Sequence, residues 1–506
     1  MGMNKLLHSR VAERSPKMDY WVSSVQYFRL KRVADKPENL EVMDMYRFQV
    51  PLLGSSSYGQ ELESAKNSYR TMLASVLGSI LDRYERNPDS RFIDTKLNLV
   101  TGQDFGTDDP IRGRNTIYPW IQGRGLEALA GHIDWLRNDP ALDREEAGRL
   151  IERSQSALKE VFSQMEHLRR LNGGRLYFMM TPQGQALCVD GQGHVVPYEL
   201  KPDSPSSFSD LFYVKGMAAA ARMLGLEKEL DESMQWIKRI CRDIVDGNFS
   251  SDQQQFDPKN IAAKKVEGRH PQGFFMIALG AIALFIRCGG DEEFKQIGFE
   301  FLDHILKFHV NLDQDSDLSK KYDMWEFVDG NGLPFVGENN VLLSDPGHAC
   351  EFVGLALGMV SAMERRYSLD ASDKGKIAHY KQVLPEILKQ NFANGFPPKA
   401  FGLPKAFDLI SRKVVNPDMP WWSLPETMRA AAWARQIVPP EERLPFETMV
   451  AECSNAFVGN YVRPDLNLMA VQTIDKDGAP VDVIPATPDA DPGYHTGLSI
   501  IDFLAS

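Results

Sequence analysis

Cysteine is scarce in this sequence and never occurs in closely spaced pairs. Five cysteines stand far apart among 506 residues, at Cys188, Cys241, Cys288, Cys350 and Cys453. An odd and dispersed set argues against a disulfide framework, and without a C-x-x-C pair a zinc finger has no ligands. We therefore expect reduced thiols, a cytoplasmic location and no metal site.

Long apolar runs and an excess of basic residues are also missing. The nearest candidate for a membrane span, Phe274 to Ile286, is too short and contains glycine. The basic N-terminus has no apolar centre of the kind found in signal peptides. Lys and Arg number 57 against 69 Asp and Glu, a net charge of −12. This balance predicts a soluble protein that binds neither nucleic acid nor membrane.

Glycine loops that bind phosphate are absent too. The three Gly-x-Gly pairs, which begin at Gly123, Gly191 and Gly330, lack the third glycine of the dinucleotide-binding pattern. The only Gly-Lys step, Gly375-Lys376, is not followed by Ser or Thr. We therefore expect neither a dinucleotide-binding loop nor a P-loop.

The sequence does contain a large apolar fraction, 43% of its residues, arranged with helical periodicity. Helices are predicted in pairs, each joined by a short polar turn and followed by a long polar or glycine-rich loop. About twelve helices result, with pairs spaced some 60 residues apart. The clearest pairs are Phe208–Leu224 with Glu227–Val245, Phe274–Arg287 with Glu292–Val310, His348–Arg365 with Lys374–Gln390, and Pro425–Gln436 with Pro445–Tyr461.

Repeated helical hairpins of this kind predict an all-α fold. We expect an (α/α)6 barrel over residues 59–506 as one catalytic domain, with the long loops on one face forming the site. Residues 1–58 are expected to be an N-terminal arm packed on the barrel. The alternative is an open helical solenoid, whose concave surface would bind another protein.

One predicted helix begins at an ionisable pair, His348 and Glu351. Pro346 and Gly347 interrupt the preceding segment, and Asp345 can accept the free N–H groups of the first turn. Residues three apart share a face of a helix, so the pair points the same way. Two interpretations fit equally: a pocket that moves protons, or a capped helix with a buried polar pair.

Other helix starts that follow the long loops should surround the same pocket. Trp325, in the segment 322–329, is expected in a strand that lines either the site or the core. Indole rings among charged groups suit a sugar, whose C–H faces stack on aromatic rings while its hydroxyls meet polar groups. The remaining candidates at these helix starts are Trp120, Arg124, His270, Trp421, Trp422, Glu426 and His495.

Five motifs in this order resemble those of the N-acylglucosamine 2-epimerase family, which includes cellobiose 2-epimerases and aldose–ketose isomerases. They are WxQGR at Trp120–Arg124, SDLFYVKG at Ser209–Gly216, PGHxxE at Pro346–Glu351, WWxxPE at Trp421–Glu426 and YHTG at Tyr494–Gly497. The resemblance covers about residues 60–505 and implies an (α/α)6 barrel. The chain departs from the family at Phe274, where a His is usual, and at Leu498, where an Arg is usual.

The resemblance implies cofactor-free proton transfer at C2 of a reducing mono- or disaccharide, through an enediolate. His348 and His495 would act as acid and base, and Arg124 would stabilise the oxyanion. Glu351 would orient His348 or raise its basicity, and Glu426 would bind hydroxyls or assist ring opening. Dimers are common in the family, so a homodimer is an expectation. Further substrate-binding residues would be Trp120, His270, Trp325, Trp421 and Trp422.

Two other functions stay open at the level of sequence. An (α/α)6 glycoside hydrolase would use Glu351 and Glu426 as its carboxylate pair. A non-catalytic barrel would bind carbohydrate without turnover. A hydrolase would tolerate the loss of His495 better than an epimerase, which needs that imidazole for proton transfer.

Overall fold

The computed structural model describes residues 58–506, except 200–203, 255, 257–265, 398–399 and 484–489. The expected N-terminal arm lies outside the described residues apart from Tyr58, where the first described helix begins. The described helices are α3 (Tyr58–Glu85), α4 (Pro119–Asn138), α5 (Arg144–Leu171), α6 (Phe208–Leu224), α7 (Glu227–Val245), α8 (Gly273–Arg287), α9 (Glu292–Phe308), α10 (Pro346–Arg366), α11 (Ala371–Gly395), α12 (Ser423–Ile437), α13 (Leu444–Asn460) and α14 (Ser499–Leu504). A π-helical turn, η5 (Tyr494–Leu498), leads into α14.

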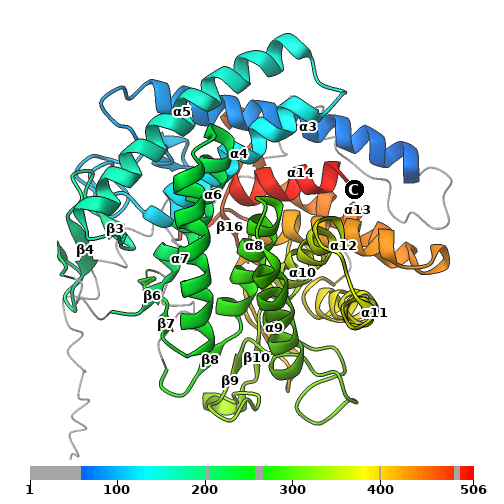
Figure 1. The fold of residues 1–506 in the computed structure, drawn as a ribbon. Helices are drawn as coiled ribbons and strands as arrows, with labels where there is room; N and C mark the ends of the chain where they lie inside the picture. Colours follow the sequence, from blue (N-terminus) through cyan, green and yellow to red (C-terminus); the bar gives the residue numbers. More distant parts are fainter. Residues whose placement is uncertain (1–57, 200–203, 255, 257–265, 398–399, 484–489) are drawn as a thin grey trace, which may run out of the picture.

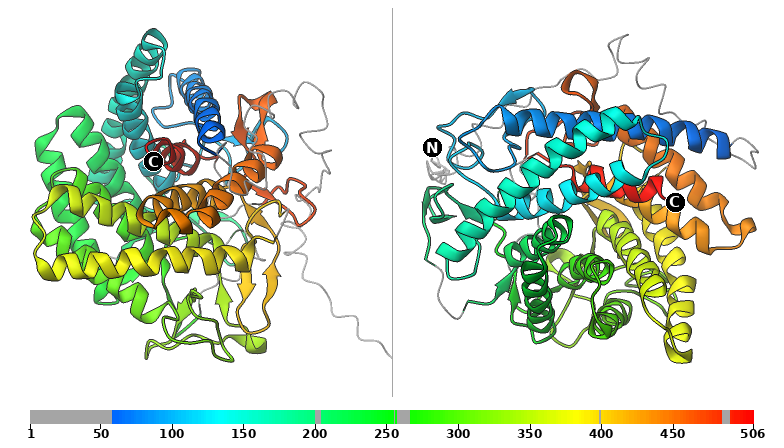
Figure 2. Two further views of the ribbon diagram at one scale, coloured as in Figure 1. Left: turned by 90° about the vertical axis from the view of Figure 1, so that its right-hand side faces the viewer. Right: turned by 45° about the horizontal axis from the view of Figure 1, so that its top comes forward.

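These helices form two concentric rings (Figures 1 and 2). In the inner ring α4, α6, α8, α10, α12 and α14 each pack on the next, and α14 with η5 returns to α4. In the outer ring α5, α7, α9, α11 and α13 each pack on the inner helix that precedes them. The sixth hairpin joins the two ends of the described chain, because α3 packs on α14. The predicted (α/α)6 barrel is therefore confirmed, and the open solenoid is wrong.

The long loops gather where the inner helices begin. The inner helices α4, α6, α8, α10 and α12 each pass to an outer partner through a short turn, whereas the return from an outer helix carries the strands. Antiparallel pairs join β8 to β9, β10 to β11 and β13 to β16, so loops from different hairpins are tied together. The strands are β1 (Leu97–Asn98), β2 (Gln103–Asp104), β3 (Met179–Met180), β4 (Ala186–Val189), β5 (Val195–Pro197), β6 (Ser206–Ser207), β7 (Phe249–Ser250), β8 (His270–Pro271), β9 (Phe327–Val328), β10 (Leu343–Ser344), β11 (Ala406–Asp408), β12 (Lys413–Asn416), β13 (Met419–Pro420), β14 (Val462–Arg463), β15 (Met469–Ala470) and β16 (Thr473–Ile474).

The inner helices are mostly apolar, as a helix enclosed on all sides must be. Within α8, for example, eleven of the fifteen residues are buried. In the described part of the chain, no helix combines the length and the hydropathy that a membrane span requires.

Two glycines set the close approach of α4 and α6. A Cβ on Gly216 would lie 2.3 Å from the carbonyl oxygen of Gly123, and a Cβ on Gly123 would lie 2.5 Å from the carbonyl oxygen of Phe212. Both obstacles are backbone atoms, which cannot rotate away as a side chain would. The helices can therefore meet at this distance only where both residues are glycine.

We predict that Gly216→Ala lowers the free energy of unfolding by at least about 1–3 kcal/mol, the usual cost of overpacking a core. Gly375→Ala is the matched control, because a Cβ there meets no atom within 4 Å. That change should be neutral or slightly stabilising, since alanine favours a helix. Thermal melts of the two variants test the contrast, and equal melting temperatures would contradict it.

Candidate active site

His348 is held at the start of α10 by two carboxylates. Asp345 caps the helix as predicted, since its Oδ1 accepts the backbone N–H groups of Gly347 at 3.0 Å and His348 at 3.2 Å. The Nδ1 atom of His348 lies 3.0 Å from Oε1 of Glu326 and 3.4 Å from Oδ2 of Asp345. A carboxylate only accepts hydrogen bonds, so Nδ1 carries a proton and Nε2 is left for other chemistry. Lys405 donates to Asp345 Oδ2 at 2.8 Å and completes this network.

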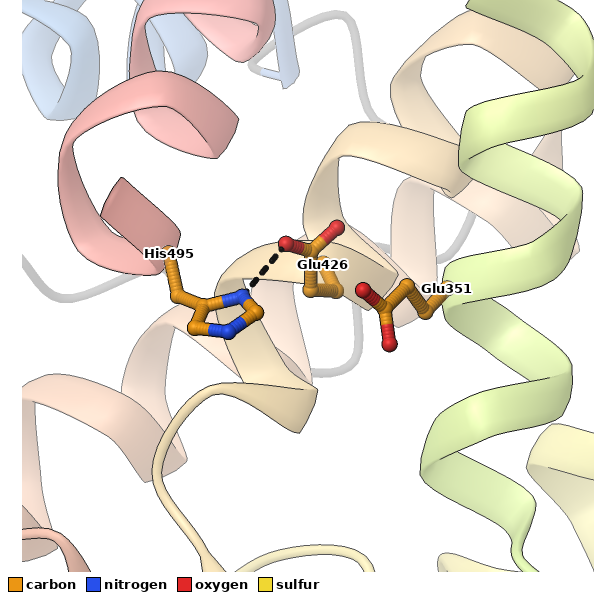
Figure 3. A group of neighbouring side chains, drawn as sticks. All are labelled: Glu351, Glu426 and His495. Atoms are coloured by element: carbon orange, nitrogen blue, oxygen red, sulfur yellow. Dashed lines mark hydrogen bonds and ion pairs between the residues drawn. The ribbon is translucent and has the colours of Figure 1, made fainter. Parts of the chain in front are cut away.

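The carboxylate that bonds to His348 is that of Glu326 and not that of Glu351, which interacts with His348 through its charge. A role of Glu351 in the basicity of His348 stays a prediction. Glu351 is one turn deeper in α10, and its carboxylate points across to Glu426 and His495 rather than back to the helix start (Figure 3). Sharing a helix face was therefore not enough to bring the two side chains together. Glu326 lies in the segment 322–329, where a strand containing Trp325 was predicted.

His495 has the same arrangement on the other side of the barrel end. Its Nδ1 lies 3.0 Å from Oε1 of Glu426, which also accepts the hydroxyl proton of Ser499 at 2.8 Å. The other oxygen of Glu426 pairs with Arg429. Asp491 positions the turn by accepting the N–H groups of Tyr494, His495 and Thr496. Both histidines thus bind a buried glutamate through Nδ1.

Trp422 contacts both imidazole rings. Its ring centroid lies 5.3 Å from that of His348, where the two rings stack, and 5.8 Å from that of His495. Trp421 meets His495 edge-on at 6.0 Å. The structure therefore brings the two histidines to one site, with tryptophan as its wall.

Charges around the site shift several pKa values. Burial opposes the charged form of His348, but Asp345 and Glu326 outweigh it and raise its pKa. Burial, reinforced by the charge of Glu426, raises the pKa of Glu351. Burial acts in the same direction on Glu426, yet the guanidinium of Arg429 prevails and lowers its pKa. The pKa values of these two adjacent carboxyls are therefore shifted in opposite directions, upward at Glu351 and downward at Glu426.

Arg124 offers a cation that no carboxylate among the described residues pairs with directly, although Glu351, Asp491 and Glu127 act on it through their charge. Its guanidinium lies over the rings of Phe212, Tyr494 and Trp120, at 4.2, 5.3 and 5.7 Å from the ring centroids. Among the described residues it forms no ion pair, and its Nε is buried without a hydrogen-bond partner. Burial accordingly lowers its pKa, although Arg124 stays charged because arginine titrates so far above neutrality.

A buried group beside Arg124 was not recognised from the sequence. Lys215 pairs with Glu127 at 3.0 Å and donates to the phenol oxygen of Tyr494. Burial raises the pKa of Tyr494 to about 12, so it keeps its proton at neutral pH. The only sequence signal was that Lys215 and Tyr494 lie within the motifs SDLFYVKG and YHTG.

The remaining candidates line the surroundings of this centre. Trp120 is buried in an aromatic cluster and donates its indole N–H to Asp252 at 3.3 Å. His270 is exposed on β8, which pairs with β9 next to Glu326. Trp325 is half-buried and packs against an apolar cluster in the loops, which fits the core interpretation better than the site. Phe274, where the resembling family has a His, packs on Phe249.

Glu351, Glu426 and His495 form the one group in the described chain with three potential metal-ligand atoms in proximity, within 4.8 Å of one another. Both oxygens of Glu426 already have partners, and a cation would have to displace Arg429. These donors therefore fit a metal ion poorly. The absence of a metal stays a prediction.

Comparison with known proteins was made by sequence and by fold. No family model and no curated protein matches the sequence. Solved structures do match. D-mannose isomerase is similar at 13% identity, with 90% of this chain and 100% of that chain covered and a TM-score of 0.58. Cellobiose 2-epimerase from Bacillus thermoamylovorans B4167 is similar at 14% identity, with 88% of this chain and 99% of that chain covered and a TM-score of 0.60. The chain shares their fold. Cellobiose 2-epimerase from Spirochaeta thermophila DSM 6192 is similar at 13% identity over 90% and 98%, with a TM-score of 0.58.

Proposed function

We propose that the protein is a sugar epimerase or aldose–ketose isomerase of the N-acylglucosamine 2-epimerase family, acting on a reducing mono- or disaccharide without a cofactor. The observation that carries this proposal is the pair of histidines, each bound through Nδ1 to a buried glutamate and both against Trp422. The fold shared with sugar epimerases and an isomerase supports it. A homodimer and a cytoplasmic location stay predictions.

In the proposed reaction the sugar ring opens and exposes an aldehyde at C1. The free Nε2 of one histidine removes the proton at C2, and the electron pair of the broken C–H bond forms the C1–C2 double bond of an enediolate. Negative charge then develops on the C1 oxygen, where the unpaired guanidinium of Arg124 can stabilise it. Return of a proton to C2 by the other histidine gives the epimer, and delivery to C1 gives the ketose.

Each glutamate fixes the tautomer of its histidine, Glu326 for His348 and Glu426 for His495, at 3.0 Å in both cases. At His348 the carboxylate of Glu326 also helps to raise the pKa, because it stabilises the imidazolium that forms when Nε2 takes up a proton. The similar environment of the two rings suits a reaction that runs in both directions.

We predict that Glu326→Gln moves the acidic limb of the pH–rate profile to lower pH by roughly one unit. The carboxylate of Glu326 raises the pKa of His348, and an uncharged amide cannot, so His348 would stay in its basic form down to a lower pH. The rate should also fall, because an amide N–H facing Nδ1 favours the wrong tautomer.

The matched control is Glu351→Gln, which removes a buried carboxyl that does not bond to His348. This variant should leave the acidic limb of the pH–rate profile at the same pH as in the wild type. Profiles of kcat against pH for both variants test the assignment. An identical shift in the two variants would contradict the pairing of His348 with Glu326.

The glycoside hydrolase alternative fits the geometry less well. Oxygens of Glu351 and Glu426 lie within 4.8 Å of each other, and Glu426 is engaged by His495, Ser499 and Arg429. Carboxylates that flank a glycosidic bond lie about 5–9.5 Å apart and need one free acid. Glu351, with its raised pKa, could supply the acid, but both oxygens of Glu426 are occupied, so it has no free oxygen with which to attack the sugar or activate a water.

The proposal is tested by incubating the protein with a panel of reducing mono- and disaccharides and separating the products by chromatography. An epimer or ketose formed from one sugar, with the glycosidic bond of any disaccharide intact, supports it. Release of monosaccharides from a disaccharide would support the hydrolase instead. Saturable binding of a sugar with no product would identify a non-catalytic barrel.

A further inference from the structure

Lys405 lies beside the N-terminal end of α10 because two strands bring it there. Strands β10 and β11 pair antiparallel. Asp345 follows β10 and Lys405 precedes β11, so both residues lie at the same end of the pair. The ammonium of Lys405 donates to Oδ2 of Asp345 at 2.8 Å and lies 5.2 Å from the centroid of the Trp422 ring. A residue 60 positions away from Asp345 in the sequence therefore reaches the surroundings of His348.

Two carboxylates compete for the one proton on Nδ1 of His348. Oε1 of Glu326 lies 3.0 Å from Nδ1, and Oδ2 of Asp345 lies 3.4 Å from it. Lys405 donates to that same oxygen of Asp345, which leaves the Nδ1 proton for Glu326. The ammonium also offsets the charge of the second carboxylate. Lys405 therefore affects both the group that holds the ring and the negative charge that the ring meets.

The charges in this network act on one another with little screening by water. The side chains of Asp345, Glu326 and Lys405 expose 3%, 7% and 16% of their surface. Oδ2 of Asp345 is 2.8 Å from Nζ of Lys405 and 3.4 Å from Nδ1 of His348, so the ammonium is within about 6 Å of the imidazole. A charge at that distance changes the balance between imidazole and imidazolium.

The pKa of His348 reflects charges of both signs. Burial and the charge of Lys405 both lower the pKa of His348, whereas Asp345 and Glu326 raise it, and the net shift is upward. Burial raises the pKa of Asp345, but the charges of His348 and Lys405 and the N–H groups at the start of α10 hold it below its usual value. Loss of Lys405 would therefore leave two charged carboxylates facing the imidazole.

Other charged or titratable residues near this network are unchanged when Lys405 is replaced. They are Glu351, which lies deeper in α10, Arg269, which interacts with Glu326 through its charge, and His495, which contacts the same Trp422 ring as His348. A difference between the wild type and a variant at residue 405 therefore reports Lys405 itself.

We propose that Lys405 is a positioning residue of this active site, whose ammonium holds Asp345 and offsets its charge, so that His348 donates from Nδ1 to Glu326 and can both accept and release a proton at Nε2. This inference rests on the proposed function, in which His348 alternates between base and acid. With two uncompensated carboxylates beside Nδ1, the imidazolium would be stabilised too strongly to return its proton to the sugar. Arg429 has the corresponding place beside Glu426, the partner of His495.

The test replaces the ammonium and follows the titration of His348 itself by NMR, in protein labelled with ¹³C at Cε1 of its histidines. The signal of His348 is the one that is missing from His348→Ala. Lys405→Met removes the charge and the hydrogen bond, Lys405→Gln removes the charge but keeps an N–H donor, and Lys405→Arg keeps both. Lys376→Met is the matched control, because Lys376 is an exposed lysine that pairs with Asp303 at 2.6 Å.

The pKa of His348 should rise by roughly one unit in Lys405→Met and in Lys405→Gln, which is about a tenfold stronger hold on the proton. It should stay close to the wild-type value in Lys405→Arg and in Lys376→Met. The acidic limb of the pH–rate profile of Lys405→Met should also move to higher pH, opposite to the change in Glu326→Gln, because His348 would reach its basic form only at a higher pH. A merely structural role would not reverse the direction of this change.

An unchanged or lowered pKa of His348 in folded Lys405→Met and Lys405→Gln would overturn the proposal, and so would an equal rise in Lys376→Met. If neither uncharged variant folded while Lys405→Arg did, Lys405 would be a structural residue, which also overturns it. The titration needs no sugar. A wild type that converts no sugar would therefore contradict the proposed function, while the titration would still decide whether Lys405 controls the charge of His348.

Discussion

His495→Ala is expected to lower the rate of sugar interconversion by about 10²–10⁴, the usual contribution of a positioned general acid or base. The side chain is buried, bound to Glu426 and in contact with Trp422, so its loss removes a positioned acid or base from the site. His348→Ala should lower the rate of sugar interconversion by a factor of the same order. Rates at saturating sugar, followed by chromatography, give the comparison.

The matched control for this prediction is His167→Ala, since His167 is an exposed histidine on α5, away from the site. It should retain full activity. A small imidazole added to His495→Ala should restore part of the rate, because the space vacated by the ring can hold it. If His495→Ala kept more than a tenth of the activity while the enzyme stayed folded, the two-histidine mechanism would be wrong.

Arg124→Met should lower kcat by about 10²–10³, as does the removal of one group that stabilises an oxyanion. Methionine keeps the apolar contact with the rings of Phe212, Tyr494 and Trp120 but carries no charge. The melting temperature should not fall, because the guanidinium has no ion-pair partner among the described residues and its burial is itself unfavourable. Residues kept for activity commonly reduce stability, so a lower kcat without a lower melting temperature would assign Arg124 to the active site.

Arg169→Met is the comparison for Arg124→Met, and thermal melts and kcat are measured for both variants. Arg169 is buried, whereas Arg124 is half-buried, and Arg169 binds Glu166 with two hydrogen bonds, at 2.9 and 2.8 Å. Arg169→Met should therefore destabilise the fold by about 3–5 kcal/mol, because the buried Glu166 is left with only the hydroxyl of Tyr213 and the distant guanidinium of Arg170, and should leave kcat unchanged. A loss of stability in Arg124→Met equal to that in Arg169→Met would assign Arg124 a structural role.

The helical hairpins were predictable because each helix carries its own periodicity and stop signals. The capping of α10 by Asp345 is a local effect, decided within three residues, and it was predicted correctly. Closure of the ring could be argued from the number of hairpins and the chain length. That its last hairpin would join the two ends of the described chain was not visible, because no local pattern links α3 to α14.

The site was predictable in its histidines but not in their partners. His348 and His495 stand in motifs at helix starts, whereas Glu326 comes from the loop before β9 and meets His348 only through tertiary packing. Glu351 was assigned to His348 from helical spacing together with the family resemblance. Helical spacing shows which residues share a face of a helix, but the direction of a long side chain depends on the groups that surround it. Lys215 was missed for the same reason: its partners, Glu127 and Tyr494, lie on other helices or turns.

The most direct test of the central claim is proton NMR of reducing sugars incubated with the wild-type protein in D₂O. The two-histidine mechanism predicts that one sugar loses its C2 proton signal and that deuterium appears at C2 of the epimer or at C1 of the ketose, with the same exchange lost in His348→Ala and in His495→Ala. A folded protein that leaves the C2 protons of every mono- and disaccharide in place would contradict it.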